Sequence, residues 1–156
     1  METVNKELII KFYSSFQKKD FKSMQECYAD NAVFSDSVFQ DLNASQVKAM
    51  WEMLCKTGKD LQLEFKNVSA TNAAGSAEWT ATYTFSRTGK KVINKIKADF
   101  VFENGKIIKH TDYFSFYNWA KQALGTAGLL LGWTSFLKNK IRKTAMKNLA
   151  DFMSKK

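Results

Sequence analysis

The sequence predicts an α+β domain in which helices come first and a run of antiparallel strands follows, so that the helices cover one face of a sheet. Apolar residues recur every three to four positions through residues 4–57, which is the period of a helix with one buried face. From Leu61 onward they alternate with polar residues, as in a half-buried strand. A length of 156 residues, 45% of them apolar, suits one domain with a complete core.

Two helices are predicted within residues 4–28. The first ends near Lys18, and its apolar face carries Val4, Leu8, Ile9, Phe12 and Phe16. Asp20 suits the N-cap of the second helix, because an aspartate side chain accepts hydrogen bonds from the free amides of a first turn. The apolar residues of this short helix are Phe21, Met24, Cys27 and Tyr28.

A short strand and a third helix follow. Residues 32–36 are small or apolar apart from their polar end, which favours a strand. Asn43 and Gln46 have the spacing of a capping box, in which each side chain bonds the other's backbone amide. The helix that they open ends near Gly58 and presents Val47, Met50, Trp51 and Leu54.

Four strands are predicted in the second half, at residues 61–66, 77–85, 92–102 and 107–116. Asn104 and Gly105 form the dipeptide that two-residue hairpin turns favour. Alternation places Trp79, Ala81, Tyr83 and Phe85 on one face of their strand. It likewise groups Ile108, His110, Asp112 and Phe114.

Residues 121–156 are predicted to extend a domain of residues 1–120. After an apolar stretch at 127–133, a final helix carries an apolar stripe of Phe136, Leu137, Ile141, Ala145, Leu149, Phe152 and Met153. Residues 118–156 hold eight basic side chains and one acidic, against 16 and 14 in residues 1–117. We expect this helix to pack on the domain with its lysines in solvent, and contact with a membrane surface ranks second.

Several functional classes are disfavoured by composition. No recognised motif accompanies the net charge of +9, so we expect no nucleic-acid partner. The longest nearly uncharged run, residues 123–137, is too short and too glycine-interrupted to span a bilayer. Cys27 and Cys55 have no pairing motif, which with the lack of an apolar leader predicts a cytoplasmic protein. A single histidine cannot supply a metal site, and nothing requires a cofactor.

Two segments carry a resemblance to a known superfamily. Residues 27–36, CYADNAVFSD, are similar to the ketosteroid isomerase segment that ends in the catalytic aspartate. Residues 105–114, GKIIKHTDYF, resemble the limonene epoxide hydrolase strand that carries an aspartic general acid. Both families, with the SnoaL-like polyketide cyclases, belong to the nuclear transport factor two-like (NTF2-like) superfamily. The resemblance covers residues 5–120 and implies a cone of three helices on a curved antiparallel sheet, and a homodimer.

The same resemblance places Asp36 at the general base of the isomerases and Asp112 at the general acid of the hydrolases. Isomerases of this fold carry an oxyanion-binding tyrosine on the first helix, where this sequence has Phe12, with Tyr13 on a neighbouring face. Their second oxyanion group falls at Ala98. An intact steroid isomerase site is therefore not expected.

Epoxide hydrolase activity is also not expected. The hydrolases hold a water with an arginine and an aspartate on the middle strand, where this sequence has Trp79 and Ala81. The first-strand tyrosine and asparagine are replaced by Phe34 and Asp36. Asp99 falls on the convex face of the sheet, through which many relatives dimerise.

The candidate catalytic residues are Asp36, Asp112 and His110. Burial beside aromatic rings would raise the carboxyl pKa values toward neutrality, which suits acid and base chemistry. The predicted ligand pocket is lined by Phe12, Phe34, Trp51, Trp79, Tyr83, Phe100 and Phe114. Structural roles remain open: Asp36 as a turn acceptor, Asp112 as a buried acceptor, and the aromatic residues as core.

The expected function follows from these residues and the resemblance together. It is a SnoaL-like or ketosteroid isomerase-like protein, an isomerase or cyclase that moves a proton in a small apolar carbonyl compound without a cofactor. The alternative is a module of the same fold that binds a small hydrophobic molecule without turnover. Loss of the oxyanion donors favours this alternative.

Overall fold

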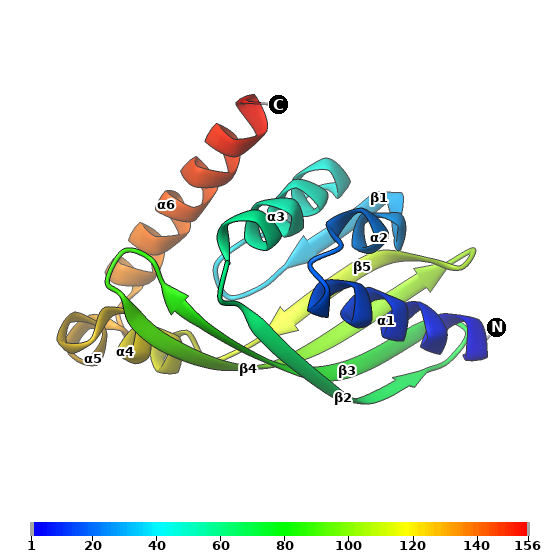
Figure 1. Cartoon of the computed structure of the whole chain (residues 1–156), viewed down its shortest axis with the longest axis horizontal. Helices are drawn as coiled ribbons and strands as arrows, with labels where there is room; N and C mark the ends of the chain where they lie inside the picture. Colours follow the sequence, from blue (N-terminus) through cyan, green and yellow to red (C-terminus); the bar gives the residue numbers. More distant parts are fainter. Residues whose placement is uncertain (1, 156) are drawn as a thin grey trace.

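One sheet of five strands, in the order β1-β5-β4-β3-β2, organises the computed structural model, which describes residues 2–155 (Figure 1). The strands are β1 (Tyr28–Ser35), β2 (Gln62–Ala70), β3 (Ala74–Phe85), β4 (Lys90–Glu103) and β5 (Lys106–Tyr113). Strands β2 to β5 are antiparallel as predicted, whereas β1 pairs in parallel with β5. The sheet is therefore mixed. No hairpin joins β1 to β5, so their connection does not force these two strands to be antiparallel.

Three helices cover the concave face of the sheet: α1 (Glu2–Gln17), α2 (Phe21–Glu26) and α3 (Ala44–Thr57) (Figure 1). The α4 (Phe116–Leu124) and α5 (Thr126–Leu131) helices lie together at one end of the sheet. From that end, α6 (Ser135–Ser154) runs back toward α3. This arrangement confirms the α+β cone with an additional C-terminal helix.

Two predicted boundaries are wrong. Tyr28 belongs to β1 rather than to the second helix, because α2 already ends at Glu26. Phe116 opens α4 instead of closing the last strand. The cause is Ser115, whose side chain accepts a hydrogen bond from the amide of Asn118 and thereby caps a new helix.

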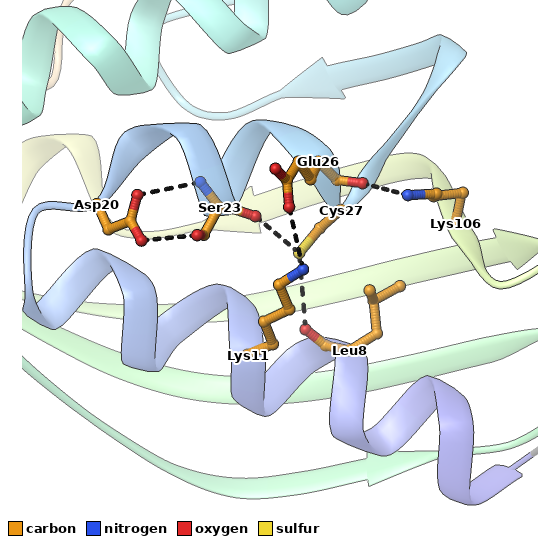
Figure 2. Close-up of polar contacts among 7 residues, drawn as sticks. All are labelled: Leu8, Lys11, Asp20, Ser23, Glu26, Cys27 and Lys106. Carbon is orange, nitrogen blue, oxygen red and sulfur yellow. Dashed lines mark hydrogen bonds and ion pairs between the residues drawn. The ribbon is translucent and has the colours of Figure 1, made fainter.

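Polar contacts attach α2 to its neighbours (Figure 2). Asp20 accepts hydrogen bonds from the amide and the hydroxyl of Ser23, which confirms the predicted N-cap. At the other end, the Glu26 carboxylate lies 3.3 Å from Nζ of Lys11. The Glu26 carbonyl accepts a bond from Nζ of Lys106 at 2.5 Å, so α2 is bonded to both α1 and β5.

The α1 helix buries Ile9, Phe12 and Phe16 as predicted, but Val4 is 48% exposed. In its place Asn5 faces the sheet, where its amide donates to the carbonyls of residues 71 and 72. The α1 helix therefore contacts the β2–β3 turn through the side chain of Asn5, and the preceding residue, Val4, faces solvent. The capping box of Asn43 and Gln46 is present at the start of α3.

A bulge changes which residues of β5 face inward. Val101 pairs with Lys109 and Phe102 with Ile107, so β5 carries one extra residue between these pairs. Ile107 is consequently buried on the face predicted for Ile108. Beyond the bulge the alternation holds, and His110 and Asp112 both face inward.

The stripe of α6 packs on the body through Leu137, Ile141 and Leu149, which are buried. Phe136, predicted within that stripe, is 72% exposed, because the buried face of α6 begins at Leu137, which lies about 100° around the helix from Phe136. Arg142 donates a hydrogen bond from Nε to the carbonyl of Ser37 at 3.2 Å. None of the helices within residues 2–155 is long and apolar enough to cross a membrane.

Candidate functional site

The predicted catalytic residues meet where β1 and β5 run side by side. Phe34 pairs with His110 and Ser35 with Thr111, so the next position places Asp36 beside Asp112. Side chains two residues apart on a strand share a face. Phe34, His110 and Asp112 therefore point toward the same interior. Asp36 lies one residue beyond β1, close enough for the charge of Asp112 to reach it.

A continuous chain of hydrogen bonds runs through His110. Trp51 donates from Nε1 to Oη of Tyr28 at 2.9 Å. Tyr28 Oη lies 2.8 Å from Nδ1 of His110, and Nε2 of His110 lies 2.9 Å from Oδ1 of Asp112. All four side chains are buried, so bulk water does not compete for these bonds.

The donors in this chain assign a tautomer to the imidazole. Tyr28 Oη already accepts a proton from Trp51, and its own hydrogen is free to go to Nδ1 of His110. The ring then carries its proton on Nε2 and donates it to Asp112. Every proton in the chain thus points from Trp51 toward the carboxylate.

Asp36 combines two of the roles considered for it. Its Oδ1 accepts hydrogen bonds from the amides of Val38 at 2.7 Å and Phe39 at 2.6 Å, so it organises the turn that follows β1. The carboxyl is half-buried. Burial raises the pKa of Asp36 to about 7, with a further contribution from Asp112 and opposing ones from the two amides and Arg142.

The tyrosines near these carboxyls are held neutral. Burial raises the pKa of Tyr28 well above its usual value, and the charge of Asp112 acts in the same direction. The pKa of Tyr13 is raised for the same two reasons. Burial also raises the pKa of Tyr83, with a smaller contribution from Asp36. Each hydroxyl is therefore a hydrogen-bond donor at neutral pH.

Most residues predicted to line the ligand pocket fill the concave interior by packing on one another. Ring centroids are 5.6 Å apart for Phe12 and Trp51 and 4.4 Å for Phe100 and His110. The buried members of this group are Phe12, Phe34, Trp51, Trp79 and Phe100. Tyr83 and Phe114 are half-buried and adjoin the second core beneath α4 and α6.

Two polar atoms in this interior lack a partner among the described residues. They are Oη of Tyr13 and Nε1 of Trp79, on rings whose centroids are 5.9 Å apart. Both are hydrogen-bond donors. A buried donor without an acceptor destabilises the fold, so a pair of them is a candidate contact for a polar atom of a ligand.

A surface cavity of about 460 Å³ lies elsewhere, at the start of β1. Its lining includes Tyr28, Lys48, Glu103 and Ile108 and none of the seven residues predicted for the ligand pocket. Its wide mouth and mixed polar lining differ from an enclosed apolar site.

Three residues of this region were missed by sequence reasoning. Tyr28 was assigned to a helix, and only its place as the first residue of β1 brings it to His110. Tyr13 lies one residue from the position indicated by the family pattern but is fully buried. Arg142 comes from the C-terminal helix, and no local signal pairs it with Ser37, 105 residues away.

The remaining candidate groups are clustered metal ligands and the two cysteine thiols. Within residues 2–155, no group of three or more His, Cys, Asp or Glu side chains could hold a metal ion. Cys27 and Cys55 are both buried and unpaired in disulfides. Burial raises the pKa of each thiol to about 11, so the thiolate is scarce at neutral pH.

Comparison with known proteins identifies the family. The model of the SnoaL-like domain matches residues 9–110. The chain belongs to the SnoaL-like domain family. Proteins of this NTF2-like fold bind small hydrophobic ligands. No curated protein sequence matches this SnoaL-like chain.

Solved structures share the fold of this SnoaL-like protein at low sequence identity. A candidate SnoaL-like polyketide cyclase from Jannaschia sp. CCS1 is 13% identical with a TM-score of 0.70, over 80% of this chain and 94% of that one. TsrD from Streptomyces laurentii is 15% identical with a TM-score of 0.66, over 80% and 97%. An LEH-like epoxide hydrolase of M. tuberculosis is 20% identical with a TM-score of 0.62, over 87% and 96%.

Proposed function

We propose that this SnoaL-like protein is an isomerase or cyclase that moves a proton within a small apolar carbonyl compound and needs no cofactor. Asp36, Asp112 and His110 carry the chemistry. The observation that supports this most directly is the pairing of β1 with β5, which brings Asp36 beside Asp112 while the pKa of Asp36 is about 7. A carboxyl of that pKa is about half protonated at neutral pH and serves as either base or acid.

In the proposed reaction the Asp36 carboxylate takes a proton from the carbon next to the substrate carbonyl. The C–H electron pair forms a carbon–carbon double bond, and the carbonyl oxygen becomes an enolate. Tyr13 and Trp79, whose donors lack a partner within residues 2–155, are available to that oxygen. The proton returns to a second carbon from Asp36, beside Asp112, whose carboxyl is held in place by the hydrogen bond from His110.

The ligand is proposed to enter at the Asp36 end of the interior. Tyr83 and Phe114 are half-buried there, whereas the rings around His110 are fully enclosed. Moving two partly exposed side chains costs less packing than opening the core. A small hydrophobic molecule therefore reaches Asp36 first.

Two measurements test this proposal. The first is a carboxyl titration by carbon-detected NMR, in which Asp36 is expected to titrate near pH 7 and to shift downward in Asp112→Asn. The second is deuterium incorporation from D₂O beside the carbonyl of a panel of small cyclic ketones. We expect enzyme-dependent exchange that Asp36→Asn reduces at least about a hundredfold.

Asp30→Asn is the matched control, because Asp30 is an exposed aspartate on β1, the strand that ends just before Asp36. It should leave exchange unchanged. An Asp36 that titrates near its ordinary value of about 3.9, or exchange that persists in Asp36→Asn, would remove the acid–base role.

A ligand-binding module without turnover is the second candidate function, and the turn geometry favours it. Both amide bonds end on the same oxygen of Asp36, as in a structural acceptor. For such a module, cyclic ketones would shift the NMR signals of Tyr83 and Phe114 without deuterium exchange.

We also infer an organisation of the whole chain. Residues 1–120 form the SnoaL-like domain, residues 121–156 form an extension packed on it, and two copies form a homodimer in the cytoplasm. The convex face of the sheet supports the dimer, since Ile93, Val101 and Tyr113 are exposed apolar residues on β4 and β5. Free buried cysteines are consistent with a reducing compartment. Sedimentation velocity tests the dimer, which Val101→Glu should dissociate.

A further inference from the structure

Five large apolar side chains are exposed together at the end of the molecule formed by α5 and the start of α6. Trp133 is 76% exposed, Phe136 72% and Leu130 62%. Leu129 at 53% and Leu131 at 44% complete the group, which we term the α5 patch. Isolated exposed apolar residues are ordinary, but five within the eight positions 129–136 indicate an interaction surface.

The local backbone explains why this helix buries none of its leucines. Gly128 packs directly on α4, where an added Cβ would lie 1.8 Å from the carbonyl oxygen of Ala120. A Cβ added at Gly132 would lie 3.0 Å from the Tyr117 ring and 3.1 Å from the Ala120 side chain. The two glycines thus take the inner side of the α4–α5 hairpin, and the bulky residues between them must point outward.

Trp133 is held in its outward position. Its Nε1 donates to the carbonyl of Leu130 at 3.0 Å, so the only polar atom of the ring already has an acceptor. The hydroxyl of Thr134 bonds to the Leu131 carbonyl and caps α6. An exposed indole with a satisfied N–H can enter an apolar phase without losing a hydrogen bond.

The sequence segments that contain or adjoin the α5 patch carry basic residues and no acidic ones. Residues 85–98 and 113–150, which form the β3–β4 turn, most of β4, α4, α5 and most of α6, contain no Asp or Glu and eleven Lys or Arg. The side chain of Lys90 lies against Gly125, at the joint of α4 and α5. Lys121 lies 4.9 Å over the ring of Tyr117, whose hydroxyl donates to the Leu129 carbonyl. Lys138 follows Phe136 by two residues.

We propose that the α5 patch docks on the surface of an anionic membrane, with the leucines, Trp133 and Phe136 inserted among the acyl chains and the surrounding lysines on the headgroups. An apolar cluster with lysines beside it fits an anionic bilayer surface, where both features contribute to binding. The cytoplasmic leaflet carries that negative charge. The contact lies at α5, the α5–α6 turn and the first turn of α6, since the stripe of α6 itself packs on the body.

Docking at this place would set the molecule in a defined orientation. The α5 patch lies at the end of the sheet opposite the N-terminus (Figure 1). It is also the end where α4 and α6 form the second core with Tyr83 and Phe114. A hydrophobic molecule dissolved in the membrane would therefore meet the proposed entrance to the Asp36 region, a consequence that rests on the proposed function.

The test is flotation of the full-length protein with vesicles of phosphatidylcholine alone or with 30 mol% phosphatidylglycerol, a proportion of roughly one anionic lipid in three. We expect the protein to float only with the anionic vesicles. Leu130→Ser should weaken partitioning more than about tenfold, because it removes one inserted side chain. Lys121→Gln should weaken it about fivefold.

Matched controls come from α1, at the far end of the molecule. Val4→Ser replaces an apolar residue that is 48% exposed, and Lys6→Gln replaces an exposed lysine. Both should float as the unchanged protein does. The fluorescence of Trp133 gives a second readout, because Trp51, Trp79 and Trp119 are at most 7% exposed and should not respond. Anionic vesicles should shift the emission to the blue, and Trp133→Phe should abolish the shift.

Three results would overturn the proposal. One is the absence of flotation with anionic vesicles. Another is equal flotation of Leu130→Ser and the unchanged protein. The third is a sedimentation experiment in which Leu130→Ser converts a dimer to a monomer while vesicles remain unbound, since a second copy would then cover the α5 patch. Failure of ketone exchange leaves this docking unaffected, so the two proposals fail separately.

Discussion

Tyr28 and His110 are joined by a hydrogen bond of 2.8 Å across 82 residues of sequence, within a core closed to solvent. Tyr28 is the point where the bond from Trp51 and the bond to His110 meet. The orientation of the imidazole toward Asp112 therefore depends on a hydroxyl that belongs to a different strand.

Tyr28→Phe should destabilise the protein by about 2–4 kcal/mol, because it leaves both Nε1 of Trp51 and Nδ1 of His110 without their partner. Urea unfolding measures this change. Tyr113→Phe is the control, since Tyr113 is 54% exposed, and it should cost less than about 0.5 kcal/mol. Nitrogen NMR of the imidazole should show the Nε2–H tautomer in the unchanged protein and lose that preference in Tyr28→Phe. An identical tautomer and stability in both proteins would contradict the directed chain.

The raised pKa of Asp36 predicts a specific pH dependence of stability. The carboxyl has a pKa of about 7 when folded and about 3.9 when unfolded, so between these values the folded state binds more protons than the unfolded state. The contribution of Asp36 to the free energy of unfolding is fully present below about pH 4. It decreases as the pH rises to 7, by up to about 4 kcal/mol.

Asp36→Asn removes that titration while keeping an acceptor for Val38 and Phe39. Relative to the unchanged protein, its free energy of unfolding should rise steadily between pH 4 and pH 7. Urea titrations at four pH values give the difference curve, in which other groups cancel. Two parallel curves would show that Asp36 is ionised in the fold.

Gly128→Ala should disrupt the α4–α5 hairpin. The new methyl group would lie 1.8 Å from the Ala120 carbonyl oxygen, so the two helices must separate, at a cost of about 2–4 kcal/mol. Gly89→Ala serves for comparison, because Gly89 has a positive φ of 72° and open space around it. It should cost only about 1 kcal/mol from backbone strain. Thermal unfolding distinguishes the two, and equal costs would argue against the close packing of α5 on α4.

The two cysteines should resist modification in the folded protein. Burial raises the pKa of both thiols to about 11, so Ellman's reagent at pH 8 should react with neither over minutes. In guanidinium chloride both should react at once, which provides the internal control. Rapid reaction of one thiol in buffer would locate a region that opens without global unfolding.

The sequence predicted most of the fold because periodicity and caps are local signals. The Asn43–Gln46 capping box, the Asp20 cap and the inward positions of His110 and Asp112 all follow from residues within a few positions of one another. The exposure of Phe136 could not be derived in this way, since it depends on which side of the first turn of α6 meets the body, and that side carries Leu137.

The residues of the candidate site also separate into those with a local sequence signal and those that depend on long-range contacts. Asp36 and Asp112 could be named from local motifs, but the parallel pairing of β1 with β5 that brings them together is a long-range contact. Tyr28 and Trp51 enter the chain to His110 only through the three-dimensional packing of α3 on β1. The bulge that buries Ile107 instead of Ile108 left no signal in the alternation.

The bond from Arg142 to the carbonyl of Ser37 also bears on how the protein is made. The turn that holds Asp36 is synthesised early, while its partner on α6 follows 105 residues later. At ribosomal speed that interval is roughly 5–20 s. During this interval the turn that holds Asp36 lacks its contact with Arg142. A nascent chain stalled before α6 would therefore contain every strand of the sheet but not the residue that bonds to this turn.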